Sequence, residues 1–449
     1  MSQSLKMPSI ELLRRDGIEL RSGEISDYDP LLDAIGDARF VLIGEASHGT
    51  HEFYRERAEI TKRLIKEKGF IAVAVEADFP DANRVNAYVN GRGNDVDAVE
   101  SLSGFERFPT WMWRNADVLD FVGWLRTHND IEKTNRQKVG FYGLDLYSLH
   151  ASIDAVLTYL GKIDPDAAAR ARKRYSCFDH FGKDSQKYGY AVNVGVADSC
   201  EDEVATQLAE LYASTADYSR RDGRVAEDEF FYATQNARLV NNAENYYRTM
   251  YRSDVSSWNL RDHHMMQTLI ALDEHLSTPE KKAKIVVWEH NSHLGDASAT
   301  AMATRGEYNV GELTRDRYGS DTYLIGFTTY SGTVTAANDW GGAAERKRVS
   351  PGLAGSYEEL FHKVGFERCL FLMIQGTSIS EILAVPMLER AIGVIYRPET
   401  ERQSHYFQAK LSHQFDALIH IDQTRAVEPL ERTPHLDSGE VMETFPTGY

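Results

Sequence analysis

The chain has 449 residues, 42% of them hydrophobic, and its 68 acidic side chains outnumber 50 basic ones to give a formal net charge of -18. This length predicts two structural units, or one large core that carries an insertion. The excess negative charge repels phosphate backbones and anionic headgroups, so it argues against nucleic acid and membrane surfaces as partners.

Cysteine usage and hydropathy indicate the cellular compartment of the protein. Cys177, Cys200 and Cys369 are odd in number, scattered and form no C-x-x-C, which suits a reducing compartment better than a disulfide scaffold. The first residues lack the apolar run of a signal peptide, and we find no apolar stretch of about 18 residues that would span a membrane. We therefore expect a cytoplasmic protein.

The first strong elements predict a βαβ unit after a polar leader over residues 1–36. Phe40–Ile43 is a short apolar run, typical of a strand buried on both faces. A helical pattern follows from about residue 51 to 68, and residues 70–75 form a second apolar run. Strand, helix and strand in this order predict two parallel strands.

The middle of the chain changes character after a third expected strand. Helical patterns at 81–90 and through Trp124 precede this strand, which covers residues 138–144. Residues 146–280 then show helical patterns almost throughout. We expect this segment to be a helical insertion that covers the carboxyl ends of the strands and sets specificity.

Strand patterns return after the helical segment. We expect strands at 284–288, at 322–328 and 333–336 as a pair with a turn near Ser331-Gly332, at 368–374 and at 392–396. The predicted fold is α/β, with a mostly parallel central sheet flanked by helices. Its core would comprise residues 37–145 and 281–400, with 401–449 as a C-terminal extension whose last ~25 residues are polar and peripheral.

Ionisable residues follow four of the expected strands. Because the carboxyl ends of parallel strands share one edge of a sheet, these side chains should gather in one cleft. They are Glu45, His48, Glu76, Asp78, Asp145, Glu289, His290 and His293.

The segment Gly44-Glu45-Ala46-Ser47-His48-Gly49 has glycines that allow a tight turn and a close backbone approach. A carboxylate, from Glu45 or Glu76, would hold the His48 imidazole in one tautomer and raise its basicity. Ser47 is not part of a G-x-S-x-G nucleophile elbow, and we expect it to be a helix N-cap.

Metal binding is a second interpretation of the histidines. His48/His51 and His290/His293 are each three residues apart, so each pair could face one side of a helical turn. H-E-x-x-H is absent, and we expect no bound metal and no cofactor. A metal-dependent hydrolase that uses the same side chains stays open as an alternative.

Four other side chains each have two possible interpretations. Trp111, Trp113 and Trp258 would line a substrate cleft or pack in the core. Arg57, in the first long helix, would belong to the site or lie on a solvated helix face.

Four segments of the sequence resemble the erythromycin esterase family, some of whose members are named succinoglycan biosynthesis proteins. They are Val41–Phe53, Ala74–Asp78, Trp258–Asp262 and Val287–His293. The similarity runs from about residue 35 to 400. The combination of G-E-x-[ST]-H-G with a distant W-x-H-N-x-H is specific.

The resemblance implies an α/β core under a helical bundle, and a hydrolase that cleaves macrolide lactone esters in its best-known members. It implies direct activation of water without a covalent intermediate. His48 resembles the general base of the family. The residues that would support it are Glu45, Glu76, Arg57, His290 and His293, while Arg261 lies in an R-D segment.

We therefore expect attack of water on the carbonyl of a small-molecule ester or lactone. Arg57 and one of His290 and His293 would stabilise the oxyanion, and Arg261 and Asp145 would join the tryptophans in binding substrate. A homodimer is compatible with the sequence. A non-catalytic binding protein of a carbohydrate pathway remains a further alternative.

Overall fold

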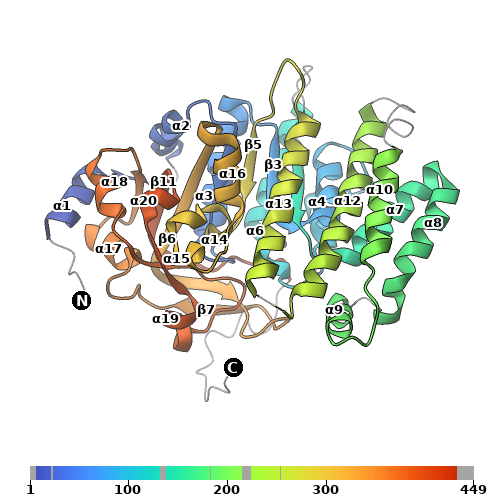
Figure 1. Cartoon of the computed structure of the whole chain (residues 1–449). Helices are drawn as coiled ribbons and strands as arrows, with labels where there is room; N and C mark the ends of the chain where they lie inside the picture. The colour runs from blue at the N-terminus through green and yellow to red at the C-terminus, as the bar shows by residue number, and fades with distance from the viewer. Residues whose placement is uncertain are drawn as a thin grey trace.

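The computed structural model describes residues 7–21, 24–131, 138–182, 184–214, 224–252 and 254–431. Its centre is a nine-stranded sheet in the order β1-β8-β11-β6-β2-β5-β3-β4, with β7 paired to β6 (Figure 1). The strands of this sheet are β1 (Ile18–Glu19), β2 (Phe40–Ile43), β3 (Ala72–Asp78), β4 (Gly140–Asp145), β5 (Ile285–Trp288), β6 (Thr322–Ala336), β7 (Glu345–Val349), β8 (Arg368–Leu372) and β11 (Ala417–Thr424). A small separate sheet pairs β9 (Met387–Arg390) with β10 (Tyr406–Ala409).

The predicted α/β class and mostly parallel sheet are confirmed. β11, β6, β2, β5, β3 and β4 pair in parallel along the sheet, whereas β1, β7 and β8 pair antiparallel. β2 lies between β5 and β6, and all four of its residues are buried. This burial explains why its sequence is continuously apolar rather than alternating.

Helices cover both faces of the sheet. In front of it in Figure 1 lie α13 (Asp254–Leu276) and α16 (Val310–Tyr318), and behind it lies α3 (His51–Lys68). Strand side chains alternate between the two layers. Phe40 and Leu42 belong to one apolar cluster, whereas Val41 and Ile43 belong to the other.

The other helices complete the layers and loops. They are α1 (Met7–Asp16), α2 (Asp29–Ile35), α4 (Phe79–Val89), α5 (Ala98–Ser101), α6 (Ala116–Ile131), α14 (Asn291–Leu294), α15 (Ala301–Thr304), α17 (Tyr357–Val364), α18 (Ser378–Leu383), α19 (Glu401–Ser404) and α20 (Leu411–Gln414). In the described part of the chain, no helix has the length and apolar character needed to cross a membrane.

The described residues of the segment 146–280 are mostly helical, with short non-helical connections. It contains α7 (Leu149–Ile163), α8 (Pro165–Tyr175), α9 (Ser185–Asn193), α10 (Glu201–Ala213), α12 (Arg224–Thr249) and α13. Most of these helices stand beside the edge strand β4 (Figure 1), and α13 returns to pack against β4. The segment is thus a lateral extension of the sheet, and α13 is the helix that it brings to the strand ends.

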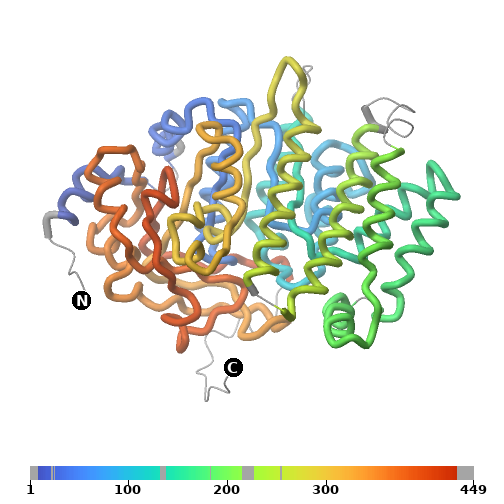
Figure 2. Tube along the Cα trace, in the orientation of Figure 1, coloured from blue at the N-terminus to red at the C-terminus, as the bar shows by residue number. Residues whose placement is uncertain are grey.

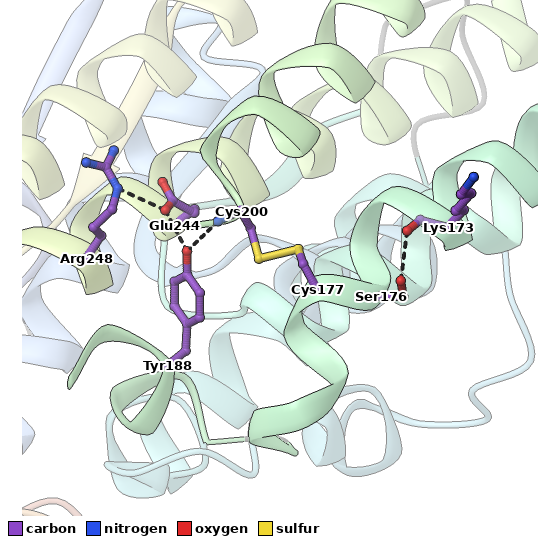
Figure 3. Close-up of a disulfide and its surroundings, with 7 residues drawn as sticks. All are labelled: Lys173, Ser176, Cys177, Tyr188, Cys200, Glu244 and Arg248. Carbon is purple, nitrogen blue, oxygen red and sulfur yellow. Dashed lines mark hydrogen bonds and ion pairs between the residues drawn. A yellow bond between two sulfur atoms is a disulfide. The ribbon is translucent and has the colours of Figure 1, made fainter. Parts of the chain in front are cut away.

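The expectation that the cysteines stay reduced is wrong for one pair. A disulfide joins Cys177 and Cys200, whose Cα atoms are 6.0 Å apart, while Cys369 is buried and free (Figure 3). Beside it, the Tyr188 hydroxyl accepts a hydrogen bond from the Cys200 amide and donates one to Glu244. The disulfide cross-links two parts of the helical segment. Cysteine usage therefore no longer argues for a reducing compartment.

Three predicted elements differ from the structure. The expected hairpin over 322–336 is the single strand β6, because β11 pairs with it in parallel through Ser331 and Gly332, where the turn was expected. Residues 392–396 form only isolated bridges, with Ser47 and Ala337. β3 runs on to Asp78, so Glu76 lies on the strand itself.

The predicted C-terminal extension, 401–449, contains a strand of the central sheet, so the core does not end at residue 400. β11 lies between β8 and β6, and most of its residues are buried. Figure 2 shows this red segment running through the interior of the C-terminal half. Residues 432–449 of the extension lie outside the described residues, as do 1–6 and 22–23 of the leader.

Candidate active site

A cavity of about 410 Å³ lies at the carboxyl ends of β2, β5, β3 and β4. The structure brings eight of the predicted site residues to its wall. They are His48, Glu76, Trp113, Asp145, Trp258, Arg261, His290 and His293. Parallel strand ends therefore gather these side chains, although they are spread over 246 residues of sequence (from 48 to 293).

Two glycines let the loop after β2 carry His48 to the cavity. A Cβ atom on Gly44 would lie 2.1 Å from Oδ1 of Asn291, and Gly49 has a φ of +90°. The amide of His48 donates to the carbonyl oxygen of Ile392 at 3.0 Å. Close backbone approach and a left-handed conformation thus explain both glycines.

His48 and Glu45 form a hydrogen-bonded pair. Nδ1 of His48 lies 2.7 Å from Oε1 of Glu45. His48 lines the cavity, whereas Glu45 is buried behind it. The carboxylate fixes the proton on Nδ1, so Nε2 offers a lone pair to the cavity. The carboxylate that orients His48 is therefore Glu45 and not Glu76.

Arg57 is fully buried behind this pair, contrary to the role in oxyanion binding expected for it. Its Nη2 lies 3.5 Å from Oε2 of Glu45, and its guanidinium stacks on Tyr54 and Trp288 at 4.5 and 4.8 Å from the ring centres. Because it does not line the cavity, it can act on substrate only through Glu45.

His290 is a neutral imidazole next to His48. Burial, with the nearby His48 ring, lowers the pKa of His290 well below its usual range. Its Nδ1 accepts a hydrogen bond from the amide of Ser292 at 3.2 Å, so the proton is on Nε2. The His48 and His290 ring centres are 4.8 Å apart. A base and a neutral hydrogen-bond donor therefore share one wall.

Arg261 connects the remaining strand ends. Its Nε and Nη2 donate to the two carboxylate oxygens of Asp145 at 3.0 and 2.8 Å. Nη2 also donates to Oε1 of Glu76 at 2.6 Å, and Nη1 to Nε2 of His293 at 2.9 Å. One planar guanidinium thus fixes groups from β3, β4 and the loop after β5.

The charges in this network keep its carboxylates ionised. Burial alone would raise the pKa of Glu76, but His293 and Arg261 outweigh it and hold that pKa well below its usual range. The second oxygen of Glu76 accepts from the amide of His290 at 2.9 Å. Glu76 therefore holds the backbone of His290 and does not face His48 as a base.

His293 is locked between two other side chains. Nδ1 lies 2.9 Å from Oδ1 of Asp262, and the ring stacks on Trp258 with centres 4.4 Å apart and planes 7° apart. Burial opposes protonation, but Asp262 and Glu76 raise the pKa of His293. Since both of its ring nitrogens are engaged, His293 is a structural partner of Arg261, whereas Nε2 of His290 is buried and has no hydrogen-bond partner among the described residues.

A metal ion would have to break these contacts. The oxygens of Glu76 and both nitrogens of His293 already have protein partners. Among the described residues, no group of three or more His, Cys, Asp or Glu side chains is arranged to hold a metal ion.

Sequence reasoning missed the second arginine of the cavity. Arg107 donates to both oxygens of Asp78 at 2.7 and 3.0 Å and stacks on Tyr147 at 4.7 Å from its ring centre. Arg261 lies 5.0 Å from the same ring centre. Asp78 was expected among the strand-end residues and does line the cavity. Tyr147 was detectable as a neighbour of Asp145, but Arg107 lies in an irregular loop with no periodic pattern.

The tryptophans divide into two kinds. Trp113 and Trp258 line the cavity, and so does Trp340, which the sequence did not single out and which is 57% exposed. Trp111 does not line the cavity and packs in the core, where its ring centre lies 5.3 Å from that of Phe108. Trp111 therefore takes the second of its two expected positions, in the core rather than in the cavity wall.

Ser47 and Glu289 are also set apart from the cavity. Ser47 is buried and contacts the hydroxyl of Thr50, which occupies the N-cap position of α3, so Ser47 is not the N-cap. Both oxygens of Glu289 are buried without hydrogen-bond partners. Burial and the carboxylates of Glu76 and Asp262 raise the pKa of Glu289 well above its usual range, so it is a neutral acid beneath the site.

Known proteins are similar to most of the chain. The chain is 22% identical to erythromycin esterase type II from Escherichia coli over 90% of this chain and 93% of that protein. It is 21% identical to the putative hydrolase YbfO from Bacillus subtilis (strain 168) over 86% and 83% of the two chains.

Solved structures share the fold. A succinoglycan biosynthesis protein superposes with a TM-score of 0.75 at 20% identity, covering 95% of this chain and all (100%) of that one. An EreC erythromycin esterase mutant in its open conformation superposes with a TM-score of 0.67 at 17% identity, covering 91% and 96%.

The family model described as erythromycin esterase matches residues 65–424. This range includes Glu76, Asp145, Arg261 and the two histidines after β5, and it begins after the His48 loop. The match extends over most of the chain, and the protein therefore belongs to the erythromycin esterase family.

Proposed function

We propose that this protein hydrolyses a carboxylic ester or lactone by direct attack of water. The observation that carries the proposal is the pairing of His48 with Glu45 behind it and the neutral His290 beside it, in one cavity. The relatives named esterase or hydrolase support a hydrolytic reaction.

The reaction would proceed in two steps. Nε2 of His48 takes a proton from water while the water oxygen bonds to the carbonyl carbon, and the N–H of His290 donates to the oxygen that becomes negative. The tetrahedral intermediate then expels the alcohol oxygen, which receives the proton from His48. Glu45 stabilises the imidazolium between the two steps.

The substrate would be a small molecule with an apolar part. Trp113, Trp258 and Trp340 offer flat apolar surfaces, and the cavity volume is within the range of small-molecule sites. A macrolide lactone is the first substrate to test because of the names of the relatives. We propose no nucleic-acid or membrane partner.

A panel of erythromycin, simple lactones and 4-nitrophenyl esters tests the proposal with the purified chain. Wild type should hydrolyse at least one class and His48→Asn should lose that activity while staying folded. A burst of product equal to the enzyme concentration would instead indicate an acyl-enzyme. Binding of a panel member without turnover would favour the non-catalytic alternative.

A further inference from the structure

A second groove, of about 640 Å³, borders the His48 loop away from the catalytic cavity and contains three arginines. Arg346 and Arg348 come from β7, and Arg425 directly follows β11. The carbonyl oxygen of Arg425 accepts from the amide of His51 at 2.8 Å. The chain has a net charge of -18. Three guanidiniums at one groove therefore contrast with the negative charge of the chain as a whole.

The strand geometry directs the β7 arginines to the same side. Residues two apart on a strand share a face, and Arg346 and Arg348 are exposed while Lys347 between them is buried. Arg348 lies opposite Thr333 on β6, a residue of the groove. Within the described part of the chain, neither guanidinium has a hydrogen-bond or ion-pair partner.

Arg425 is positioned by a buried carboxylate. Glu52 accepts from its Nε at 3.0 Å and from its amide at 2.7 Å. The Arg425 side chain is nevertheless 70% exposed. Glu52 thus neutralises and fixes one arginine, while the two on β7 keep uncompensated positive charge.

We propose that this groove binds the phosphate group of a non-aromatic phosphorylated small molecule, such as a sugar phosphate. Guanidiniums match phosphate oxygens with paired N–H donors. The described residues that line the groove include no aromatic ring on which a nucleotide base would stack.

The polar rim favours a polyol attached to the phosphate. Thr333, Gln423 and Thr424 supply hydroxyl and amide groups. Glu367 is the carboxylate of the groove that has no arginine partner among the described residues, and it would accept a hydrogen bond from a sugar hydroxyl while disfavouring a polyanion. The groove exceeds the size of a bare phosphate, which agrees with a larger ligand.

Isothermal titration of the full chain with glucose 6-phosphate, and with glucose as the neutral probe, tests the proposal. Glucose 6-phosphate should bind and glucose should not. Arg346→Gln combined with Arg348→Gln should weaken the binding by about tenfold or more, as expected for lost charge-assisted hydrogen bonds. Both side chains are exposed and unpaired, so the double variant should fold normally.

Two controls locate the site. Arg172→Gln combined with Lys173→Gln removes the same charge from the exposed face of α8 and should leave the affinity unchanged. Arg107→Gln alters the catalytic cavity and should also leave it unchanged. The proposal is overturned if glucose 6-phosphate fails to bind at about 10 mM, if glucose binds equally, or if Arg107→Gln rather than the β7 double variant abolishes binding.

Discussion

Oε1 of Glu45 lies 2.7 Å from Nδ1 of His48, and of the two residues only His48 lines the cavity. Such an arrangement lets a carboxylate set the tautomer of a base without touching the substrate. The activity should therefore depend on a side chain that never contacts the reacting atoms.

Glu45→Gln should lower kcat by about 10²–10⁴-fold, the usual contribution of general-base assistance, with a small change in KM. The amide cannot stabilise the imidazolium that forms during attack. Steady-state kinetics on an ester found to be hydrolysed checks this. Ser47→Ala is the matched control from the same loop and should keep most of the activity, whereas equal losses in both variants would contradict the assignment.

Arg261→Lys should lower kcat/KM by about 10²-fold, because a point charge cannot fix Asp145, Glu76 and His293 together. Arg261→Ala should also lower the free energy of unfolding by about 3–5 kcal/mol, since it leaves buried carboxylates uncompensated. Urea unfolding and kinetics measure the two effects. Arg172→Lys on exposed α8 should change neither quantity.

Trp113 and Trp111 provide a matched pair of indoles. Trp113→Leu should raise KM because it removes part of the cavity wall, and it should also lower the free energy of unfolding because Trp113 is buried in the same apolar cluster as Trp111. Trp111→Leu should leave KM unchanged and lower the free energy of unfolding by about 3 kcal/mol, as for other large core truncations. The reverse pattern would place Trp111 in the substrate site.

Chelation should not affect the hydrolysis. The oxygens of Glu76 and the nitrogens of His293 are engaged by Arg261, His290 and Asp262, so a tightly bound ion would lack ligands. Activity is measured before and after dialysis against EDTA, alongside elemental analysis. About one equivalent of zinc, with activity lost on its removal, would favour the metal-dependent alternative.

His264 should make stability depend on pH. Burial lowers its pKa from 6.5 to about 3, and its Nδ1 lies 2.9 Å from the amide nitrogen of Asn242. The unfolded chain binds a proton below pH 6.5 but the native ring does not, so this contribution is complete above pH 6.5 and is lost as pH falls towards 3.

At pH 5 the loss from this one ring should be about 2 kcal/mol relative to pH 7. Between pH 7 and pH 5, the free energy of unfolding of His264→Gln should therefore fall by about 2 kcal/mol less than that of wild type. Urea unfolding at the two pH values measures this difference. His263→Gln, on the neighbouring and exposed ring, should retain the wild-type dependence. Identical slopes in all three proteins would refute the assignment.

The strand ends were predictable because buried apolar runs mark parallel strands, and their carboxyl ends meet. Sequence could not decide whether Glu45 or Glu76 orients His48, since both follow a strand and only hydrogen-bond geometry separates them. Sequence analysis missed Arg107 and Trp340 because irregular loops have no periodicity.

Other errors have non-local causes. The turn signal at Ser331-Gly332 was overridden by pairing with β11, about 90 residues away. The Cys177–Cys200 bond joins residues 23 apart, and neither spacing nor composition revealed it. The end of the core was placed too early, at residue 400, because β11 has only a short apolar run, residues 417–419, and polar residues follow Ile421.

The position of β11 has a consequence for the nascent chain. During synthesis every other strand of the central sheet is made before β11, yet β6 and β8 join only through it. Until Ala417–Thr424 emerge, the edges of β6 and β8 that pair with β11 have no partner, and such edges recruit foreign strands. Completion of the sheet must therefore wait for the synthesis of β11, and a ribosome stalled before Ala417 would present an aggregation-prone intermediate.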